Sequence, residues 1–373
     1  MTKMTAVKMH SINRKQVFKL IYENRGITRT QLSEALELSL PTISQNLKAL
    51  EDEGLIERSG HFGSTGGRKP DVYCCVGNAR IAIGLHIRKP GFTIVAVDLY
   101  GNILGLRRVT ASYRHTDEYY KSVGEKINEF IDMNGYDPDS ILGIGIALTA
   151  LLSKDRKEIK KSILLGEKEA KIDDFAKWLS YPCQMFHDSE AAASGEMWLS
   201  KNISDALYLG LNHHLNGTLI INGAVHEGKE YTGGLVEHMT LVPGGEECYC
   251  GRKGCFSAYC STRKLFDDDE ASREAFFTKL RSGGADETRK WKAYLKNLSM
   301  AVGSLYPVLD CDIIMGGDIG SYMNEQDIKE IQELALAGYE FAPESDFIRL
   351  GHEHPSISAS GAAIYYIAEF LDN

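Results

Sequence analysis

Residues 233–261, GGLVEHMTLVPGGEECYCGRKGCFSAYCS, carry the most specific pattern in this chain. Three cysteines, Cys248, Cys250 and Cys255, follow the spacing C-x-C-x4-C, and His238 precedes the first of them by ten residues. Cysteine thiolate and histidine imidazole are preferred ligands of Zn2+. Three thiolates and one imidazole complete the closed tetrahedral coordination of a structural zinc site. Glycines between the cysteines permit the tight turns that such convergence requires. A chance cluster of buried free cysteines explains this spacing poorly, so the segment predicts a Zn2+ site formed by these four side chains.

The length and composition indicate a multidomain globular protein. At 373 residues the chain exceeds one ordinary hydrophobic core and suggests two or three domains. No apolar run reaches the length of a membrane span, and the N-terminus lacks the apolar core of a signal peptide. Eight cysteines, several in metal-ligand spacing, fit a reducing compartment better than a disulfide framework. We therefore expect a cytoplasmic protein that has no membrane contact.

Charge is distributed unevenly along the chain. The formal net charge is −9, but residues 1–70 hold 11 Lys and Arg against 7 Asp and Glu, a net charge of +4. Residues 71–373 hold 31 Lys and Arg against 44 Asp and Glu, a net charge of −13. A small basic segment on a large acidic body suggests a polyanionic partner for the basic segment only, although a solvated helical face would give the same count.

The first 75 residues have the pattern of a winged helix-turn-helix domain. Apolar residues at helical spacing predict three short helices, at residues 11–25, 28–36 and 41–53. A Gly-rich hairpin is expected after them, at residues 59–73. Either Thr28 or Thr30 is the expected N-cap of the second helix, and Ser39 is the expected N-cap of the third. We assign residues 1–75 to this domain.

In such a domain the third helix enters the major groove of DNA, and side chains near its N-terminus reach the base edges. The candidates on this helix are Thr42, Ser44, Gln45 and Lys48. The wing carries GSTGGRKP, where Arg68 and Lys69 are candidates for contacts with phosphates or the minor groove. A helical protein-interaction module is the alternative, but the third helix and the wing together favour double-stranded DNA as the partner.

Beyond the first domain, strands and helices alternate. Strands are expected in IAIGLHI, FTIVAVDLYGNIL, ILGIGIAL, PCQMF, ALYLGL and TLIING, and helices near residues 116–134 and in DSEAAASGEMWL. Alternation over some 290 residues implies an α/β architecture, with two lobes and a cleft between them.

The order of the motifs resembles one family over nearly the whole chain. A winged helix ending in STGGRKP is followed by AIGLHI, GIGIAL, HDSEAAASGE, GGLVEH…CYCGRKGC, IIMGGDIG and SGAA. This order is similar to that of the ROK family of repressors and sugar kinases. The resemblance implies an actin/hexokinase-like (ribonuclease H-like) fold for residues 76–373, which serve as an effector-binding and oligomerisation domain. The winged N-terminus is typical of the repressor branch, and residues 238–255 form the zinc loop.

The phosphate-binding turns of the family's kinases are altered in this chain. Their first loop resembles D-x-G-G-T-K, whereas residues 86–91 here begin with His86 and contain Pro90, which has no backbone donor. The glycine-rich second loop corresponds to residues 212–218, where most glycines are gone. Asp318 replaces the third glycine of a later G-G-G turn and would repel phosphate. We therefore expect no enzyme activity; the alternative is a ROK-type sugar kinase that carries a winged helix.

The sugar-binding residues of the family are only partly present. The resemblance places the family's conserved Asp at Asp188, with His187 in place of the preceding Asn, and it retains His238. Two family glutamates correspond to Leu235 and Ser257. Asp188 also fits a helix N-cap, which would be a purely structural role. The candidate effector-binding residues are His187, Asp188, Glu190 and His238.

These observations predict a transcriptional regulator, most simply a repressor of carbohydrate-related genes. Symmetric pairs of winged helix-turn-helix domains bind the half-sites of a palindromic operator, so a homodimer or homotetramer is expected. A sugar or sugar derivative is the possible effector, and Zn2+ is the expected cofactor.

Overall fold

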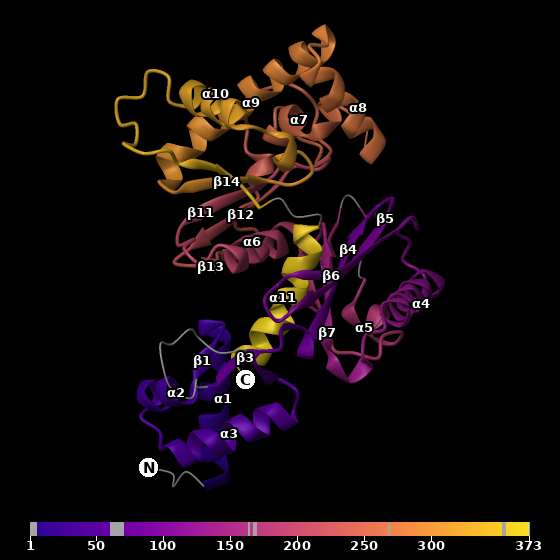
Figure 1. Ribbon diagram of the computed structural model, residues 1–373. Coiled ribbons are helices and arrows are strands. Elements are labelled where there is room, and N and C mark those ends of the chain that lie inside the picture. The colour runs from indigo at the N-terminus through magenta and orange to yellow at the C-terminus, as the bar shows by residue number, and fades with distance from the viewer. Residues whose placement is uncertain are drawn as a thin grey trace.

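The computed structural model describes residues 6–59, 71–162, 165–166, 170–267, 269–352 and 356–372. A small N-terminal head lies at one end of the molecule, and two lobes follow it (Figure 1). The C-terminus returns to the head. The wing-tip candidates Arg68 and Lys69 lie outside the described residues.

The head contains three helices and a small antiparallel sheet. Its elements are α1 (Ala6–Asn24), β1 (Ile27–Thr28), α2 (Arg29–Leu36), α3 (Leu40–Asp52), β2 (Ile56–Arg58) and β3 (Val72–Cys75), and its strand order is β1-β3-β2. Thr28 caps α2 in a capping box with Gln31, which decides between the two expected caps. Ser39 caps α3 as expected, and its hydroxyl accepts from the Thr42 amide.

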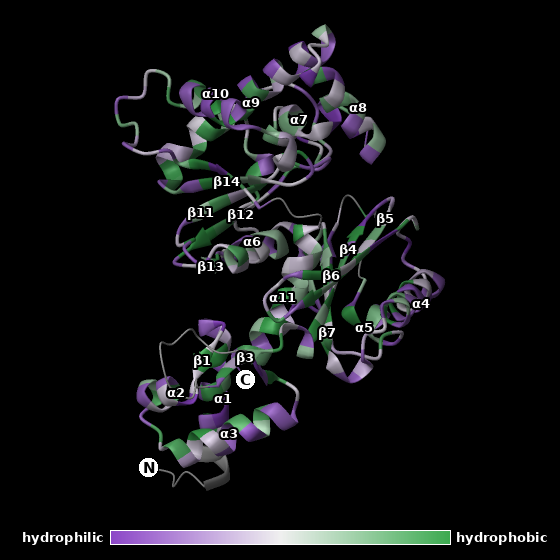
Figure 2. Ribbon diagram, viewed as in Figure 1, coloured by the Kyte–Doolittle hydropathy of each residue, from purple (hydrophilic) through white to green (hydrophobic). Residues whose placement is uncertain are grey.

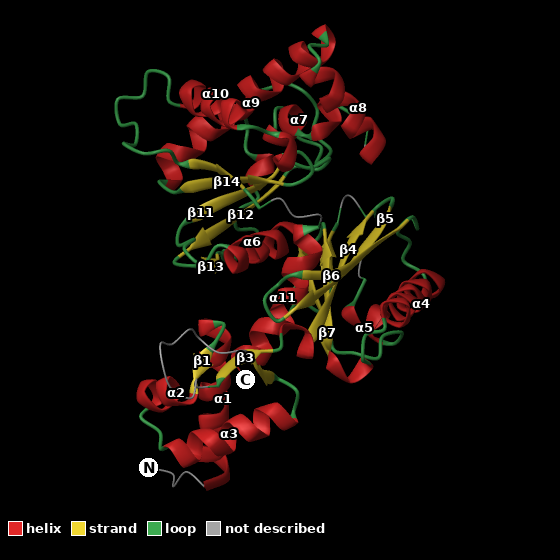
Figure 3. Ribbon diagram, viewed as in Figure 1, coloured by secondary structure: helices red, strands yellow, loops and turns green. Residues whose placement is uncertain are grey.

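The first lobe is a five-stranded sheet with helices on both faces. Its strands are β4 (Ile81–Arg88), β5 (Gly91–Asp98), β6 (Ile103–Val109), β7 (Ile141–Leu148) and β10 (Cys183–His187), in the order β10-β7-β4-β5-β6. Helices α4 (Asp117–Asn134) and α5 (Ile172–Ala176) pack on one face, and α11 (Ile357–Asp372) packs on the other (Figure 3). A short hairpin, β8 (Leu151–Leu152) and β9 (Ile159–Lys161), extends from this lobe.

The second lobe is also built on a five-stranded sheet. Its strands are β11 (Ala206–Gly210), β12 (Asn216–Ile221), β13 (Ala224–Val225), β14 (Asp312–Gly316) and β15 (Ile348–Leu350), in the order β13-β12-β11-β14-β15. Helix α6 (Asp188–Leu199) covers one face. The other face is covered by α7 (Phe256–Cys260), α8 (Glu270–Arg281), α9 (Ala285–Leu309) and α10 (Glu325–Ala335). The strands of both sheets are largely hydrophobic, as expected when helices cover both faces (Figure 2).

Helices α6 and α11 meet where the two lobes join. A Cβ atom added at Gly361 would lie 1.7 Å from the Ala191 carbonyl oxygen, and one at Gly195 would lie 2.7 Å from Ile357 Cδ1. The two helix backbones are therefore in direct contact, which only glycine permits at these positions. This contact is the main packing between the helix layers of the two lobes.

The two-lobed α/β body and the winged head agree with the fold class expected from the sequence. The last strand of the head, β3, ends at Cys75, and the first strand of the body, β4, begins at Ile81. Among the residues that the structure describes, no helix has the length and apolar character needed to cross a membrane.

Candidate metal centre, ligand cavity and DNA-binding surface

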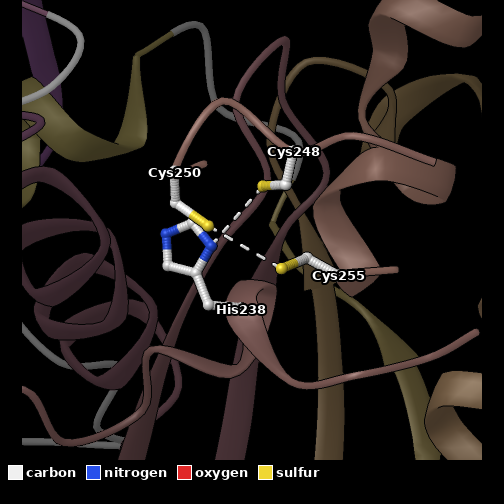
Figure 4. A group of neighbouring side chains, drawn as sticks. All are labelled: His238, Cys248, Cys250 and Cys255. Atoms are coloured by element: carbon white, nitrogen blue, oxygen red, sulfur yellow. Dashed lines mark hydrogen bonds between the residues drawn. The ribbon is translucent and has the colours of Figure 1, made fainter. Parts of the chain in front are cut away.

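The four expected metal ligands converge (Figure 4). Ligand atoms of His238, Cys248, Cys250 and Cys255 all lie within 4.8 Å of one another. The Cys250 and Cys255 sulfurs are 3.8 Å apart, and Cys248 Sγ is 3.7 Å from His238 Nδ1. With Zn–S bonds of about 2.3 Å and Zn–N bonds of about 2.0–2.1 Å, a tetrahedral site has edges of about 3.8 Å and 3.6 Å. The side-chain spacing therefore fits a tetrahedral Zn2+ site.

Backbone turns in the zinc loop hold the cysteines in this arrangement. Gly251 and Gly254 adopt φ values of +86° and +81°, and a Cβ atom at Gly254 would lie 1.8 Å from the Val242 carbonyl oxygen. Only glycine fits there without moving the backbone. Burial raises the pKa of the Cys248 thiol to about 12. A thiolate at this position therefore needs a bound cation to balance its charge.

Tyr249, between two of the cysteines, contacts the other side of the His238 ring. Its hydroxyl lies 3.3 Å from His238 Nε2, and its ring packs edge-on against the rings of His238 and His214 at 5.2 and 5.3 Å between centroids. His238 is not among the described residues that line the cavity between the lobes. The sequence-based interpretation gave Tyr249 no role. The one sequence feature that could have indicated a role is that a bulky residue stands between the two cysteines of the C-x-C motif.

A cavity of about 590 Å³ lies between the lobes. The residues that line it include Asp188, Glu196, Tyr208, Arg88, Lys89 and Asp318. Of the four candidate effector-binding residues, Asp188 alone is among the described residues that line it. Carboxylates of this kind accept paired hydrogen bonds from ligand hydroxyl groups.

Asp188 in the cavity wall has several polar partners. Its carboxylate accepts hydrogen bonds from Thr149 Oγ1 at 2.5 Å and Asn216 Nδ2 at 3.1 Å. His86 Nε2 and His187 Nδ1 lie 3.8 and 3.3 Å from it. Burial opposes ionisation, but the neighbouring imidazoles and the Thr149 hydroxyl hold the pKa of Asp188 well below its ordinary value. The Asp188 side chain in the cavity wall is therefore an ionised carboxylate.

One alternative for this region needs correction, and one candidate residue has an ion-pair partner of its own. The N-cap of α6 is His187, whose ring accepts from the Ser189 amide, so Asp188 is the first helical residue and not the cap. Glu190 binds Arg156 at 2.8 Å. The same guanidinium binds Glu227 at 2.7 Å, so Glu190 belongs to an ion-pair network beside the cavity.

Asp318, which also lines the cavity, binds two arginines. Arg88 from β4 makes a bidentate contact with its carboxylate at 3.3 and 3.2 Å, and Arg273 from α8 lies 3.5 Å away. Burial raises the pKa of a carboxyl group, but these cations hold the pKa of Asp318 below its ordinary value. The pair Arg88–Asp318 joins the first lobe to the second.

The four side chains of α3 that are predicted to contact DNA are exposed or half-buried. Gln45 and Lys48 are exposed, whereas Thr42 and Ser44 are half-buried. Ser44 Oγ donates to the Leu40 carbonyl at 2.8 Å and accepts from Arg29 at 3.2 Å. Arg29, at the start of α2, therefore lies beside the predicted contacts, although the sequence-based interpretation gave it no role. An exposed cation at this place suits a phosphate contact.

A winged helix joined to a two-lobed body of this topology defines a DNA-binding regulator built on a sugar-kinase-like scaffold. The ROK family pattern matches residues 82–369, and a winged helix-turn-helix DNA-binding pattern matches residues 11–57. The chain belongs to the ROK family.

Its relatives agree with this assignment. The xylose repressor of Bacillus subtilis is 26% identical over 261 residues, covering 68% of this chain and 67% of that protein. The DNA-binding transcriptional dual regulator NagC of Escherichia coli is 24% identical over 257 residues, covering 68% and 63%. The crystal structure of a ROK family transcriptional regulator, a homologue of E. coli MLC, superposes with a TM-score of 0.72 at 19% identity, covering 97% and 98%. A ROK family glucokinase from Streptomyces griseus has a TM-score of 0.66 at 19% identity, and it covers only 76% of this chain.

The chain is therefore a repressor-like DNA-binding regulator of the ROK family.

Proposed function

We propose that this protein represses carbohydrate-related genes by binding a double-stranded operator through its head, and that a sugar or sugar derivative in the cavity controls that binding. The observation that carries the proposal is the combination of an exposed α3 with a separate cavity whose wall holds the ionised Asp188. One relative is a xylose repressor, which supports a sugar as the class of effector.

Operator binding is tested with duplexes selected by the full-length protein from a random-sequence pool. Gln45→Ala should weaken binding to the selected duplex by about 1–3 kcal/mol and relax the base preference at one position. Lys48→Ala should weaken binding more uniformly and reduce its salt dependence. Lys329→Ala, on the exposed face of α10, is the matched control and should leave binding unchanged. Failure to select any sequence would refute the DNA-binding proposal.

The protein is expected to act as a homodimer or homotetramer, since a symmetric pair of heads reads a palindromic site. Selected duplexes should then contain two inverted half-sites. Sedimentation of the protein with and without the duplex checks the stoichiometry. A single half-site bound by one chain would argue against the symmetric assembly.

Effector binding is tested by thermal shift with D-xylose, N-acetylglucosamine and their phosphates, because a ligand that binds only the folded state raises the melting temperature. Asp188→Asn should abolish the shift, since the amide replaces a charged acceptor with a group that also donates. Glu190→Gln is the control, because the Arg156 pair lies beside the cavity. A shift retained in Asp188→Asn would remove Asp188 from the proposed site.

The Zn2+ proposal rests on the fit of the four ligand atoms described above. A bound Zn2+ would tie residues 238–255 into one rigid loop and make its stability depend on the metal. Tyr249 would orient the His238 ring, and the glycine turns would place the three sulfurs.

A further inference from the structure

The head is attached to the body through the first lobe at two places. Phe18 of α1 packs edge-on against Phe370 of α11, with ring centroids 6.0 Å apart. Tyr22 donates its hydroxyl to the Leu99 carbonyl at 2.9 Å and stacks on Tyr100 at 4.7 Å with an interplanar angle of 8°. Leu99 and Tyr100 lie in the turn between β5 and β6. Helix α11 and this turn therefore determine the orientation of the head.

The turn is rigid because its own side chains hold it. Asp98 accepts hydrogen bonds from the amides of Tyr100 and Asn102 at 2.9 and 2.8 Å. Gly101 adopts φ +85°, which a residue with a Cβ atom rarely does. A displacement applied to the Tyr100 backbone would therefore move the whole turn, including the ring that stacks on Tyr22.

Trp198 of α6, in the second lobe, contacts this turn. Its indole Nε1 donates to the Tyr100 carbonyl at 3.0 Å, and its ring lies against Gly101, where an added Cβ atom would be 2.8 Å from Trp198 Cδ1. Helix α6 starts at Asp188 in the cavity wall and spans about 18 Å at 1.5 Å per residue. One helix thus connects the cavity with the turn on which the head is mounted (Figure 1).

The geometry also provides a pivot. Between its two ends, α6 contacts α11 backbone-to-backbone at Ala191 and Gly195. Residues of the head and of the first lobe share one buried hydrophobic cluster, so the head and the first lobe are packed together. A rotation of the second lobe about the α6–α11 contact would move Trp198 against the turn that this cluster joins to the head.

We propose that Trp198 is the positioning residue through which relative movement of the two lobes reaches the DNA-binding head. The coupling runs from α6 through the Trp198–Tyr100 hydrogen bond to the Tyr22 stack. It deepens the proposed function and rests on it, since it specifies how the state of the cavity would alter DNA affinity. Coupling of this kind requires two lobe arrangements that the head can distinguish.

The test needs no effector, because a mutation can change how the two lobes are arranged relative to each other. Asp318→Asn removes the charge that holds Arg88 of the first lobe, so it should change the lobe arrangement. We expect it to change the affinity for a duplex selected by the wild-type chain by at least about fivefold. In a Trp198→Phe background, which keeps an aromatic ring but lacks the N–H donor, the effect of Asp318→Asn should fall to within about twofold, as a double-mutant cycle measures.

Trp178→Phe is the matched control background, because Trp178 Nε1 has no hydrogen-bond partner among the described residues. It should leave the Asp318→Asn effect intact. If Trp198→Phe does not fold, as judged by thermal unfolding, Tyr22→Leu interrupts the same path by removing the ring that stacks on Tyr100.

Two outcomes would overturn the proposal. Either Asp318→Asn leaves DNA affinity unchanged in the folded wild-type background, or its effect is the same in the Trp198→Phe and wild-type backgrounds. Absence of DNA binding by the wild-type chain is a different result, because it refutes the proposed function itself.

Discussion

The hydroxyl of Tyr249 lies 3.3 Å from Nε2 of His238, whose Nδ1 faces the Cys248 sulfur at 3.7 Å. One nitrogen of the imidazole thus faces the metal-ligand cluster and the other faces a side chain of the same loop. A hydrogen bond at the second nitrogen selects the tautomer that leaves the first free to bind a metal.

Tyr249→Phe should therefore lower the affinity for Zn2+ by about 10- to 100-fold, the usual cost of losing such a partner. Competition with a chromophoric chelator measures this change. Tyr365→Phe, at an exposed tyrosine far along the chain in α11, is the control and should bind Zn2+ like the wild type. Equal affinities in all three proteins would show that the Tyr249 hydroxyl does not orient the ring.

Removal of one thiol should release the metal altogether. Cys250→Ser is expected to lose the single Zn2+ that the wild type should carry, because a hydroxyl is a poor substitute for a thiolate ligand. The melting temperature should fall by several degrees, since binding free energy at such a site is folding free energy. Metal analysis and thermal unfolding check both effects. Cys183→Ser, at a half-buried cysteine in β10, should keep its metal, and a metal-free but equally stable wild type would contradict the Zn2+ proposal.

His214 should make stability depend on pH below neutrality. Burial and the charge of Arg263 lower the pKa of His214 to about 3 in the folded protein, whereas the unfolded value is about 6.5. Above the unfolded value both states are neutral, and the full stability is present. As the pH falls from 6.5 towards 3, the unfolded state alone takes up the proton, so stability is lost at up to about 1.4 kcal/mol per pH unit.

Urea unfolding at several pH values between 4.5 and 7 measures this slope. His214→Gln should show a smaller slope, because the group that gains the proton on unfolding is gone. His226→Gln, at an exposed position, should keep the wild-type slope. Parallel curves for the wild type and His214→Gln would mean that His214 takes up its proton over the same pH range in the folded and unfolded states.

Much of the architecture could be predicted because its signals are local. The cap at Ser39, the metal-ligand spacing and the helix over DSEAAASGEMWL each depend on residues within one turn or one loop. The inter-lobe contacts could not be predicted in this way. Arg88 and Asp318 are 230 positions apart, and Trp198 and Tyr100 are 98 apart, so periodicity holds no information about them. Asp318 illustrates the limit: the sequence indicated a loss of phosphate binding, but the arginine pair became evident only when the lobes were placed.

The same limit applies to Gly361, where the sequence shows only a small residue in a late helix. A Cβ atom there would lie 1.7 Å from the Ala191 carbonyl oxygen, so Gly361→Ala must separate α11 from α6. Overpacking of this kind costs about 1–3 kcal/mol, and more when the obstacle is backbone. Urea unfolding should therefore show a loss at or above that range. Gly320→Ala, whose nearest obstacle would be the Met315 carbonyl oxygen at 3.3 Å, should cost clearly less. Equal losses in the two variants would mean that the α6–α11 contact is looser than the structure indicates and could not serve as a pivot.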